Sequence, residues 1–142
     1  MTAETIRASV LVNAAPETVF DYFTQSEAMV AWMGEWAHLD ARAGGEFAVD
    51  IKGAAVRGEY LVVERPSRLL ISWGHAGSEH LPPGASTLEV LLRPTADGTE
   101  VEIRHSGLPD PEASEHPAGW RHFLGALAAV HAERQHGSPR RC

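Results

Sequence analysis

The feature that most constrains the fold is a change of hydrophobic period at Trp36. After this residue apolar side chains alternate with polar or small ones in short runs, as in Phe47, Val49 and Ile51. A period of two is that of a β-strand with one buried face. Four further runs follow, VRGEYLVVE, RLLISW, STLEVLLR and TEVEIRHS. Because only short breaks separate most of these runs, we expect six strands from Trp36 onward in an antiparallel meander.

The breaks between the runs carry turn residues. The strongest hairpin signal is Asp97-Gly98, which we expect to join residues 86–93 to residues 99–106. Residues 74–85 predict a longer loop. The remaining breaks are Gly44-Gly45, Lys52-Gly53 and Pro66-Ser67.

The segment before Trp36 predicts one strand and two short helices. Residues 6–14 are rich in β-branched side chains and predict a strand. Pro16 suits the first position of a helix, and Val19, Phe20 and Phe23 then share one helical face. We expect a second short helix over SEAMVAWM, capped by Ser26 and ended by Gly34.

The C-terminal part predicts a long amphipathic helix. Its apolar stripe consists of residues spaced by three and four, namely Trp120, Phe123, Leu124, Leu127 and Val130. Two starts are open, because Asp110-Pro111 and Pro117 both suit a helix start and Pro117 would kink a helix begun earlier. An antiparallel sheet with one apolar face needs a cover, and this helix is the only candidate of the right size.

Composition excludes several classes of function. The 142 residues fit one domain, and the formal charge of −7 with scattered Lys and Arg argues against nucleic-acid binding. The single cysteine, Cys142, cannot form an internal disulfide. We find no apolar signal core and no run of membrane-spanning length, and therefore expect a cytoplasmic protein without a membrane partner.

A cluster of histidines and carboxylates precedes the final helix. It comprises His105, His116 and His122 with Asp110, Glu112 and Glu115. His116 and His122 are six residues apart, so they lack the spacing of four at which two helical histidines share a zinc ion. We therefore expect no metal and no cofactor, and interpret the carboxylates as favourable charges at a helix start and His116 and His122 as solvated.

Six segments together resemble a known family. They are APETVFDYFT (residues 15–24), Trp32, GGEF (44–47), RGEYLVVERPSRLLISW (57–73), DGTEVEIRHSGLP (97–109) and GWRHFLGALA (119–128). In this order they resemble the bacterial homologues of the activator of the heat-shock-protein ATPase, which belong to the START and birch-pollen-allergen superfamily of helix-grip folds. The resemblance covers roughly residues 5–130.

The resemblance implies an α+β helix-grip fold. A curved antiparallel sheet of about seven strands, including a first strand followed by two short helices, would wrap around the long C-terminal helix. It implies a single domain over residues 1–142, for which we expect an ordered core at about 5–135 and a flexible tail at 136–142. In the superfamily the cavity between sheet and helix binds apolar or amphipathic molecules, but no catalytic motif is common to all members.

His105 is the strongest polar candidate on the expected inner face. Val101, Ile103 and His105 are alternate residues of one strand, so their side chains point to the same face. His105 is therefore either a histidine hydrogen-bonded at the edge of the core or the polar group that orients a ligand. Trp73 and Tyr60 are further polar candidates. The tryptophans, Trp36 included, are expected on or near inward faces. The full set expected to line the ligand site is Trp32, Phe47, Val49, Tyr60, Trp73, Val90, Ile103, His105, Trp120, Phe123, Leu124 and Leu127.

The function predicted from these observations is binding of a small apolar or amphipathic ligand between sheet and C-terminal helix, without catalytic residues. One alternative is a cyclase-, aromatase- or hydrolase-like enzyme, which would need at least two polar groups converging on one point. There is no Gly-x-Ser-x-Gly sequence for a serine nucleophile. Another alternative is an interaction module that stimulates a chaperone ATPase and would need an apolar surface patch. A protein partner or a homodimer is compatible with either.

Overall fold

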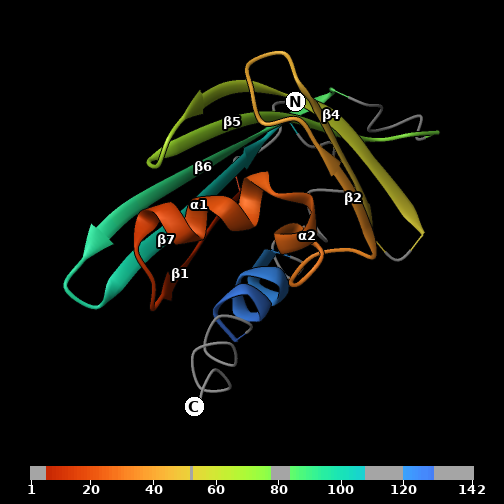
Figure 1. Cartoon of the computed structure of the whole chain (residues 1–142). Helices are drawn as coiled ribbons and strands as arrows, with labels where there is room; N and C mark the ends of the chain where they lie inside the picture. Colours follow the sequence, from red (N-terminus) through yellow and green to blue (C-terminus); the bar gives the residue numbers. More distant parts are fainter. Residues whose placement is uncertain (1–5, 52, 78–83, 108–119, 130–142) are drawn as a thin grey trace.

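The computed structural model describes residues 6–51, 53–77, 84–107 and 120–129 (Figure 1). Its strands form one seven-stranded antiparallel sheet in the order β1-β7-β6-β5-β4-β3-β2. The strands are β1 (Ile6–Val12), β2 (Trp36–Leu39), β3 (Glu46–Ile51), β4 (Ala54–Glu64), β5 (Arg68–His75), β6 (Ser86–Thr95) and β7 (Gly98–Ser106). Two helices, α1 (Pro16–Thr24) and α2 (Ser26–Met29), connect β1 to β2, and residues 120–129 form the C-terminal helix.

The predicted meander of six strands is confirmed. Each strand from β2 to β6 pairs with its successor, and β1 returns to pair with β7 from Ile6↔His105 to Val12↔Thr99. The β6–β7 hairpin closes where Thr95 pairs with Gly98. Gly98 has φ +140°, and a Cβ atom there would collide with the carbonyl oxygen of Val12. Glycine therefore serves both the turn and the close approach of β1.

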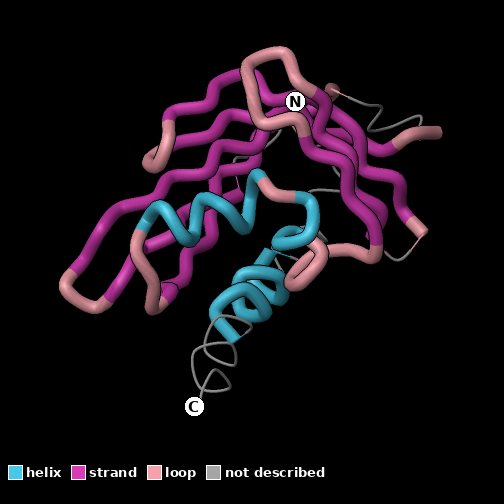
Figure 2. The backbone as a smooth tube through the Cα atoms, viewed as in Figure 1, coloured by secondary structure: helices cyan, strands magenta, loops and turns pink. Residues whose placement is uncertain are grey.

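The sheet curves around the helices. Figure 2 shows α1, α2 and the C-terminal helix on the same side of the strands, which we call the inner side. The register of β4 against β5 shifts between Tyr60 and Val62, which is a β-bulge. A bulge bends a strand and increases its twist. The extra residue, Leu61, is exposed, while Tyr60 is fully buried.

The first helix follows the prediction and the second departs from it. Pro16 begins α1, and Val19, Phe20 and Phe23 are buried. The prediction that Ser26 caps a helix running to Gly34 is wrong. Gln25 is the cap residue of α2, the helix ends at Met29, and the Ser26 hydroxyl instead accepts a hydrogen bond from the backbone N–H of Leu39, at 3.1 Å. This long-range bond fixes the entry into β2.

The C-terminal helix presents the predicted stripe. Trp120, Leu124 and Leu127 are buried, Phe123 is partly buried, and His122 is exposed, as expected. The two candidate starts of this helix, Val130, the tail and residues 78–83 of the predicted loop lie outside the described residues. No helix among the described residues is long and apolar enough to cross a membrane.

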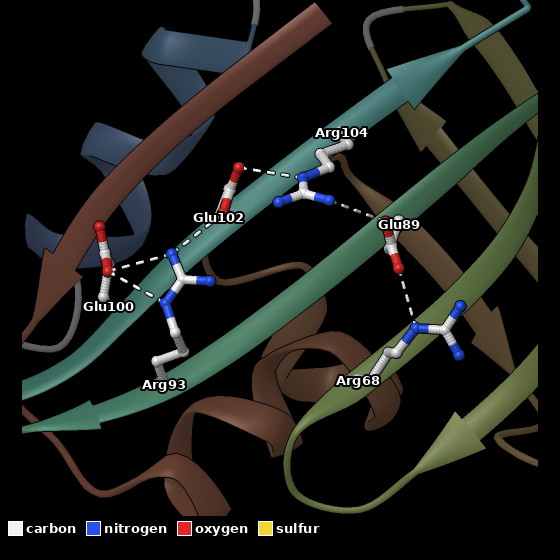
Figure 3. A network of polar contacts seen from close by, with 6 residues as sticks. All are labelled: Arg68, Glu89, Arg93, Glu100, Glu102 and Arg104. Atoms are coloured by element: carbon white, nitrogen blue, oxygen red, sulfur yellow. Dashed lines mark hydrogen bonds and ion pairs between the residues drawn. The ribbon is translucent and has the colours of Figure 1, made fainter. Parts of the chain in front are cut away.

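The outer face of the sheet carries alternating charges. Figure 3 shows a network across β5, β6 and β7 in which each cation lies between carboxylates or beside one. Its members are Arg68, Glu89, Arg104, Glu102, Arg93 and Glu100, with N–O distances of 2.8–3.9 Å between successive members. Hydrogen bonds from Arg104 and Arg93 lower the pKa of Glu102, whose side chain is only 15% exposed. This face is therefore polar and largely self-neutralised, so apolar surface is concentrated on the inner face.

Candidate functional site

The residues predicted to line a ligand site lie on the inner side of the sheet or on the elements packed against it. All are buried except Phe123, which is partly buried. The parity argument that placed His105 with Val101 and Ile103 agrees with the structure, since all three have an exposed fraction of 0%. Burial alone, however, does not distinguish a binding wall from an ordinary core, and the contacts between the side chains are more informative.

Five of the predicted residues form a continuous group, which we call the aromatic cluster. Its members are Phe47 of β3, Tyr60 of β4, Trp73 of β5, His105 of β7 and Trp120 of the C-terminal helix. Ring centroids are 5.7 Å apart for Phe47–Tyr60 and Phe47–Trp73, and 5.4 Å apart for Trp73–His105 and Trp73–Trp120. These spacings are those of favourable edge-to-face and tilted aromatic pairs. Trp73 is the centre of the group.

The other two tryptophans lie apart from these contacts. Trp32 packs edge-on against Phe23 with centroids 5.1 Å apart, and its indole N–H donates to the carbonyl of Tyr22 at 2.9 Å. The expectation that Trp36 faces inward is wrong, because this residue is 47% exposed on the edge strand β2. The guanidinium of Arg57 lies 5.4 Å from its ring centroid, a cation–π contact that covers the ring from outside.

A buried hydrogen-bonded chain links the C-terminal helix to the sheet. The indole Nε1 of Trp120 donates to Nδ1 of His105 at 3.0 Å, and Nε2 of His105 lies 2.9 Å from Oγ of Ser86. The Ser86 hydroxyl donates to the backbone carbonyl of Trp73 at 2.8 Å. We call this arrangement the polar chain. It joins the helix to β7, β6 and β5.

The direction of the polar chain follows from hydrogen-bond chemistry. An indole N–H can only donate, so Nδ1 of His105 must be the acceptor and carry no proton. The neutral imidazole then carries its proton on Nε2, which donates to Ser86, and the serine proton points to the carbonyl of Trp73. Each donor in the chain meets an acceptor.

This direction is the reverse of that in a nucleophilic serine–histidine pair. There the imidazole accepts the serine proton at Nε2, while an acceptor holds the proton on Nδ1. In this protein Nε2 is already protonated and Trp120 offers a donor to Nδ1. Ser86 and His105 do converge on one point, as an enzyme would require, but with the wrong proton arrangement for general-base activation of Ser86.

Sequence reasoning missed Ser86 as a member of the site. The signal that could have found it is its parity, since Ser86 begins β6 and alternates with the inward residues Leu88, Val90 and Leu92. A polar side chain at an inward strand position, near an inward polar residue of the neighbouring strand, predicts a buried hydrogen bond. Its register partner in β5 is Trp73, while His105 pairs with the next inward residue of β6, Leu88.

Tyr60 and Trp73, the other polar candidates, differ in how they are satisfied. The Tyr60 hydroxyl donates to the carbonyl of Phe23 at 2.8 Å. Burial raises the pKa of the Tyr60 phenol well above its usual value, and the negative charge of Asp40 raises it further. Tyr60 is therefore a neutral, fully bonded member of the cluster.

Trp73 has an indole N–H without a hydrogen-bond acceptor. Among the described residues, two buried side-chain polar atoms have no hydrogen-bond partner, Asp50 Oδ1 and Trp73 Nε1. Asp50 Oδ1 lies 3.0 Å from a guanidinium nitrogen of Arg57, so its charge is compensated. Trp73 is only 4% exposed, and aromatic rings of Phe47, His105 and Trp120 surround it. A buried donor left unpaired in this way costs about 1–3 kcal/mol.

The structure describes only part of the predicted histidine and carboxylate cluster. His105 is buried in the polar chain and His122 is exposed on the C-terminal helix, whereas His116, Asp110, Glu112 and Glu115 lie outside the described residues. Within the described part of the chain, no three His, Cys, Asp or Glu side chains gather in a way that could hold a metal ion.

Surface hollows away from the cluster have a different character. One of about 730 Å³ lies at the β6–β7 turn, between residues 13–16 and 94–98. Another of about 290 Å³ lies on the outer face beside Arg7, Arg93 and Glu102. Both are lined largely by turn or charged residues and lack aromatic side chains, so neither resembles the predicted apolar site.

Solved structures support the fold. An AHSA1-like protein from Rhizobium etli is 36% identical and has a TM-score of 0.74, with 99% of this chain and 91% of that chain covered. CalU16 from Micromonospora echinospora is 28% identical at a TM-score of 0.75, covering 96% and 77% of the two chains. A protein from Mesorhizobium loti is 21% identical at a TM-score of 0.81, covering 92% and 98%. The helix-grip architecture expected from the sequence is thereby confirmed.

The family assignment rests on a match over most of the chain. No curated protein sequence matches this one. The family model described as "Activator of Hsp90 ATPase homolog 1-like protein" matches residues 13–132, which include every described strand after β1, both short helices and the C-terminal helix. This agrees with the resemblance expected from the six sequence segments. The chain belongs to the family of Activator of Hsp90 ATPase homolog 1-like proteins.

Proposed function

We propose that this protein binds a small apolar or amphipathic molecule between the inner face of the sheet and the C-terminal helix, against the aromatic cluster. The observation that carries the proposal is the cluster itself. Its rings come from three neighbouring strands, from β7 and from the helix; three of them contact Trp73, and Tyr60 joins through Phe47. Aromatic side chains give a binding wall large and stiff apolar area. Membership of a family with the helix-grip fold supports the same location.

The distribution of charge supports the inner face over the outer one. The outer face of β5, β6 and β7 carries the Arg–Glu network, which an apolar ligand could cover only by desolvating charges. The inner face near Trp73 has neutral polar groups instead, because His105 is the neutral tautomer and Tyr60 is protonated. Among the described residues, the rings that contact Trp73 are those of Phe47, His105 and Trp120, and none of them carries a charge.

The polar chain has a positioning role in this proposal. It fixes Trp120, and with it the C-terminal helix, at a defined distance from β7. The sequence favours His105 as the polar partner of the ligand, but Trp120 and Ser86 already form hydrogen bonds with its two ring nitrogens. We therefore infer that His105 holds the C-terminal helix against the sheet, so that the ligand binds to a preorganised site.

The energetics set the expected affinity for a simple apolar probe. Burying roughly 300 Å² of apolar surface gains about 7 kcal/mol at about 25 cal/mol per Å². Association costs at least about 4 kcal/mol, which leaves binding in the millimolar range. Selection of one molecule among many then depends on polar contacts.

The two alternatives receive less support. An enzyme using Ser86 as nucleophile conflicts with the proton arrangement of the polar chain. A chaperone-activating module would need an apolar patch, yet the large apolar side chains exposed in the described part of the chain are dispersed. Leu11 lies on the edge strand β1 and Trp36 on the opposite edge strand β2, with Leu61 on β4 and Val30 after α2.

The test uses ethylbenzene as an apolar probe and the four indole N–H resonances of the ¹⁵N-labelled full chain. We expect titration to move the Trp73 and Trp120 resonances along saturable curves with a millimolar Kd. Trp36, exposed at the edge of the sheet, provides the internal control and should not move. Shifts confined to Trp36, or none at any indole, would contradict the proposal. Native mass spectrometry of protein purified from its own host then addresses the natural ligand.

A further inference from the structure

We propose that the indole N–H of Trp73 is the recognition donor of this site, and that the ligand therefore presents a hydrogen-bond acceptor such as a carbonyl oxygen to it. This inference rests on the proposed function and adds the chemical class of the ligand. The natural occupant would combine an apolar body with at least one neutral acceptor.

The argument begins with which polar groups are already satisfied. Tyr60 donates to the carbonyl of Phe23, and His105 and Ser86 are joined within the polar chain. The indole of Trp120 donates to His105, and that of Trp32 donates to the carbonyl of Tyr22. Among these inner-side donors, the Trp73 N–H stands apart because none of the described residues accepts its proton.

The surroundings of Trp73 explain why an acceptor from outside the chain fits. The indole is 4% exposed and its ring contacts are Phe47, His105 and Trp120. The carbonyl of Trp73 itself is engaged by Ser86. In protein interiors buried donors are nearly always bonded, and exceptions point to a functional role or to a bound partner. An indole N–H cannot accept, so a ligand hydroxyl would have to turn its oxygen toward Trp73, whereas a ketone, ester or ether oxygen suits it without rearrangement.

The charge of the groups around Trp73 further restricts the chemical class of the ligand. The rings that contact Trp73 carry no charge, since Phe47 and Trp120 do not ionise and His105 carries a single ring proton. An anionic carboxylate would meet no cation among the ring contacts of Trp73, and burying it unpaired would be costly. The structure thus favours a neutral acceptor over a charged one.

The experiment compares acetophenone with ethylbenzene, which replaces the ketone carbonyl with a methylene group. Each probe is titrated into the ¹⁵N-labelled full chain, and Kd values are measured for wild type, for Trp73→Phe and for Trp36→Phe. The ratio of the two Kd values is compared between variants, which cancels the difference in hydrophobicity of the probes. We expect Trp73→Phe to reduce the relative preference for acetophenone by about tenfold, the factor equivalent to about 1.4 kcal/mol. The Trp36→Phe ratio should equal that of wild type.

The indole resonance provides a readout that needs no variant. Acetophenone should shift the resonance of the Trp73 N–H proton downfield, as a new hydrogen bond does. Ethylbenzene has no acceptor and should not cause this downfield shift. The Trp32 and Trp120 resonances, whose protons are already bonded, should respond alike to both probes. If Trp73→Phe fails to fold, this comparison alone decides the question.

The outcomes separate the two proposals. If neither probe perturbs Trp73 or Trp120, the proposed function fails. If both probes bind but the Kd ratio is unchanged in Trp73→Phe, or the Trp73 resonance responds alike to both, the site binds apolar molecules and the recognition role of Trp73 is refuted. A buried water already bonded to the indole would give this second result.

Discussion

Replacement of Ser86 by alanine is the most direct test of the polar chain. Ser86 is buried, accepts the Nε2 proton of His105 and donates to the carbonyl of Trp73. The alanine variant leaves the ring N–H of His105 buried without its serine acceptor, which costs about 1–3 kcal/mol, and loses the bond to the carbonyl, worth about 0.5–1.5 kcal/mol. We expect the free energy of unfolding to fall by about 1.5–4.5 kcal/mol, the sum of the two terms.

A double-mutant cycle isolates the His105–Ser86 bond. His105→Phe removes the ring N–H that Ser86→Ala would leave unpaired, while leaving the Trp120 N–H without its acceptor. In the His105→Phe background, Ser86→Ala should therefore cost only the bond to the Trp73 carbonyl, about 0.5–1.5 kcal/mol. The coupling between the two residues is expected at about 1–3 kcal/mol, above the departure from additivity of independent sites.

Urea unfolding followed by circular dichroism measures these differences, with equal m-values required across the four proteins. Ser67→Ala is the matched control, since Ser67 is exposed and its hydroxyl bonds only locally to the carbonyl of Glu64. It should change stability by less than about 0.5 kcal/mol. Additive effects of Ser86→Ala and His105→Phe would refute the direct bond between the two side chains.

Three further predictions concern the helix, the cluster and metals. Leu124→Ala should lower the free energy of unfolding by roughly 2–5 kcal/mol, because Leu124 is buried between helix and sheet. Arg121→Ala, at an exposed position of the same helix, is the control, and an equally small loss in both variants would contradict this packing. The folded state raises the pKa of Tyr60 above the unfolded value near 10, so its contribution to stability is complete below about pH 10 and is lost as the pH rises toward the folded pKa. Urea unfolding between pH 8 and 11 (an assay range of about three units) should show a steeper decline for wild type than for Tyr60→Phe, and parallel declines would count against it. Exhaustive chelation should leave the Tm unchanged, whereas a drop that zinc restores would reopen the histidine and carboxylate cluster.

Local pattern determined most of the fold. The alternation of Phe47, Val49 and Ile51 and of the later runs is a property of neighbouring residues, and each run became a strand. The stripe of Trp120, Leu124 and Leu127 likewise depends only on helical spacing. Parity within a strand also placed His105 inward. These successes share one cause, which is that strand and helix periods fix the direction of side chains before tertiary contacts form.

The prediction failed where a distant partner decided the outcome. Ser26 has the side chain of a helix cap, but its hydroxyl is taken by the backbone of Leu39. Trp36 has the size of a core residue, yet its strand is the last of the sheet order, where no further strand covers it. Neither fact is encoded in the residues next to it.

The candidate site divides in the same way. Its aromatic members could be named from the sequence because they lie at inward positions of predicted elements. The polar chain could not be predicted from the sequence, since Ser86 and Trp120 lie 19 and 15 residues from His105. Only the strand register and the docking of the helix bring the three side chains together. The direction of its protons follows from which group meets which nitrogen, and the unpaired N–H of Trp73 follows from the absence of an acceptor among the described residues around it. Sequence determined which residues face inward, and tertiary structure decided which of their polar atoms find a hydrogen-bond partner among the described residues and which do not, because hydrogen bonding depends on atomic distances that residue spacing along the chain does not fix.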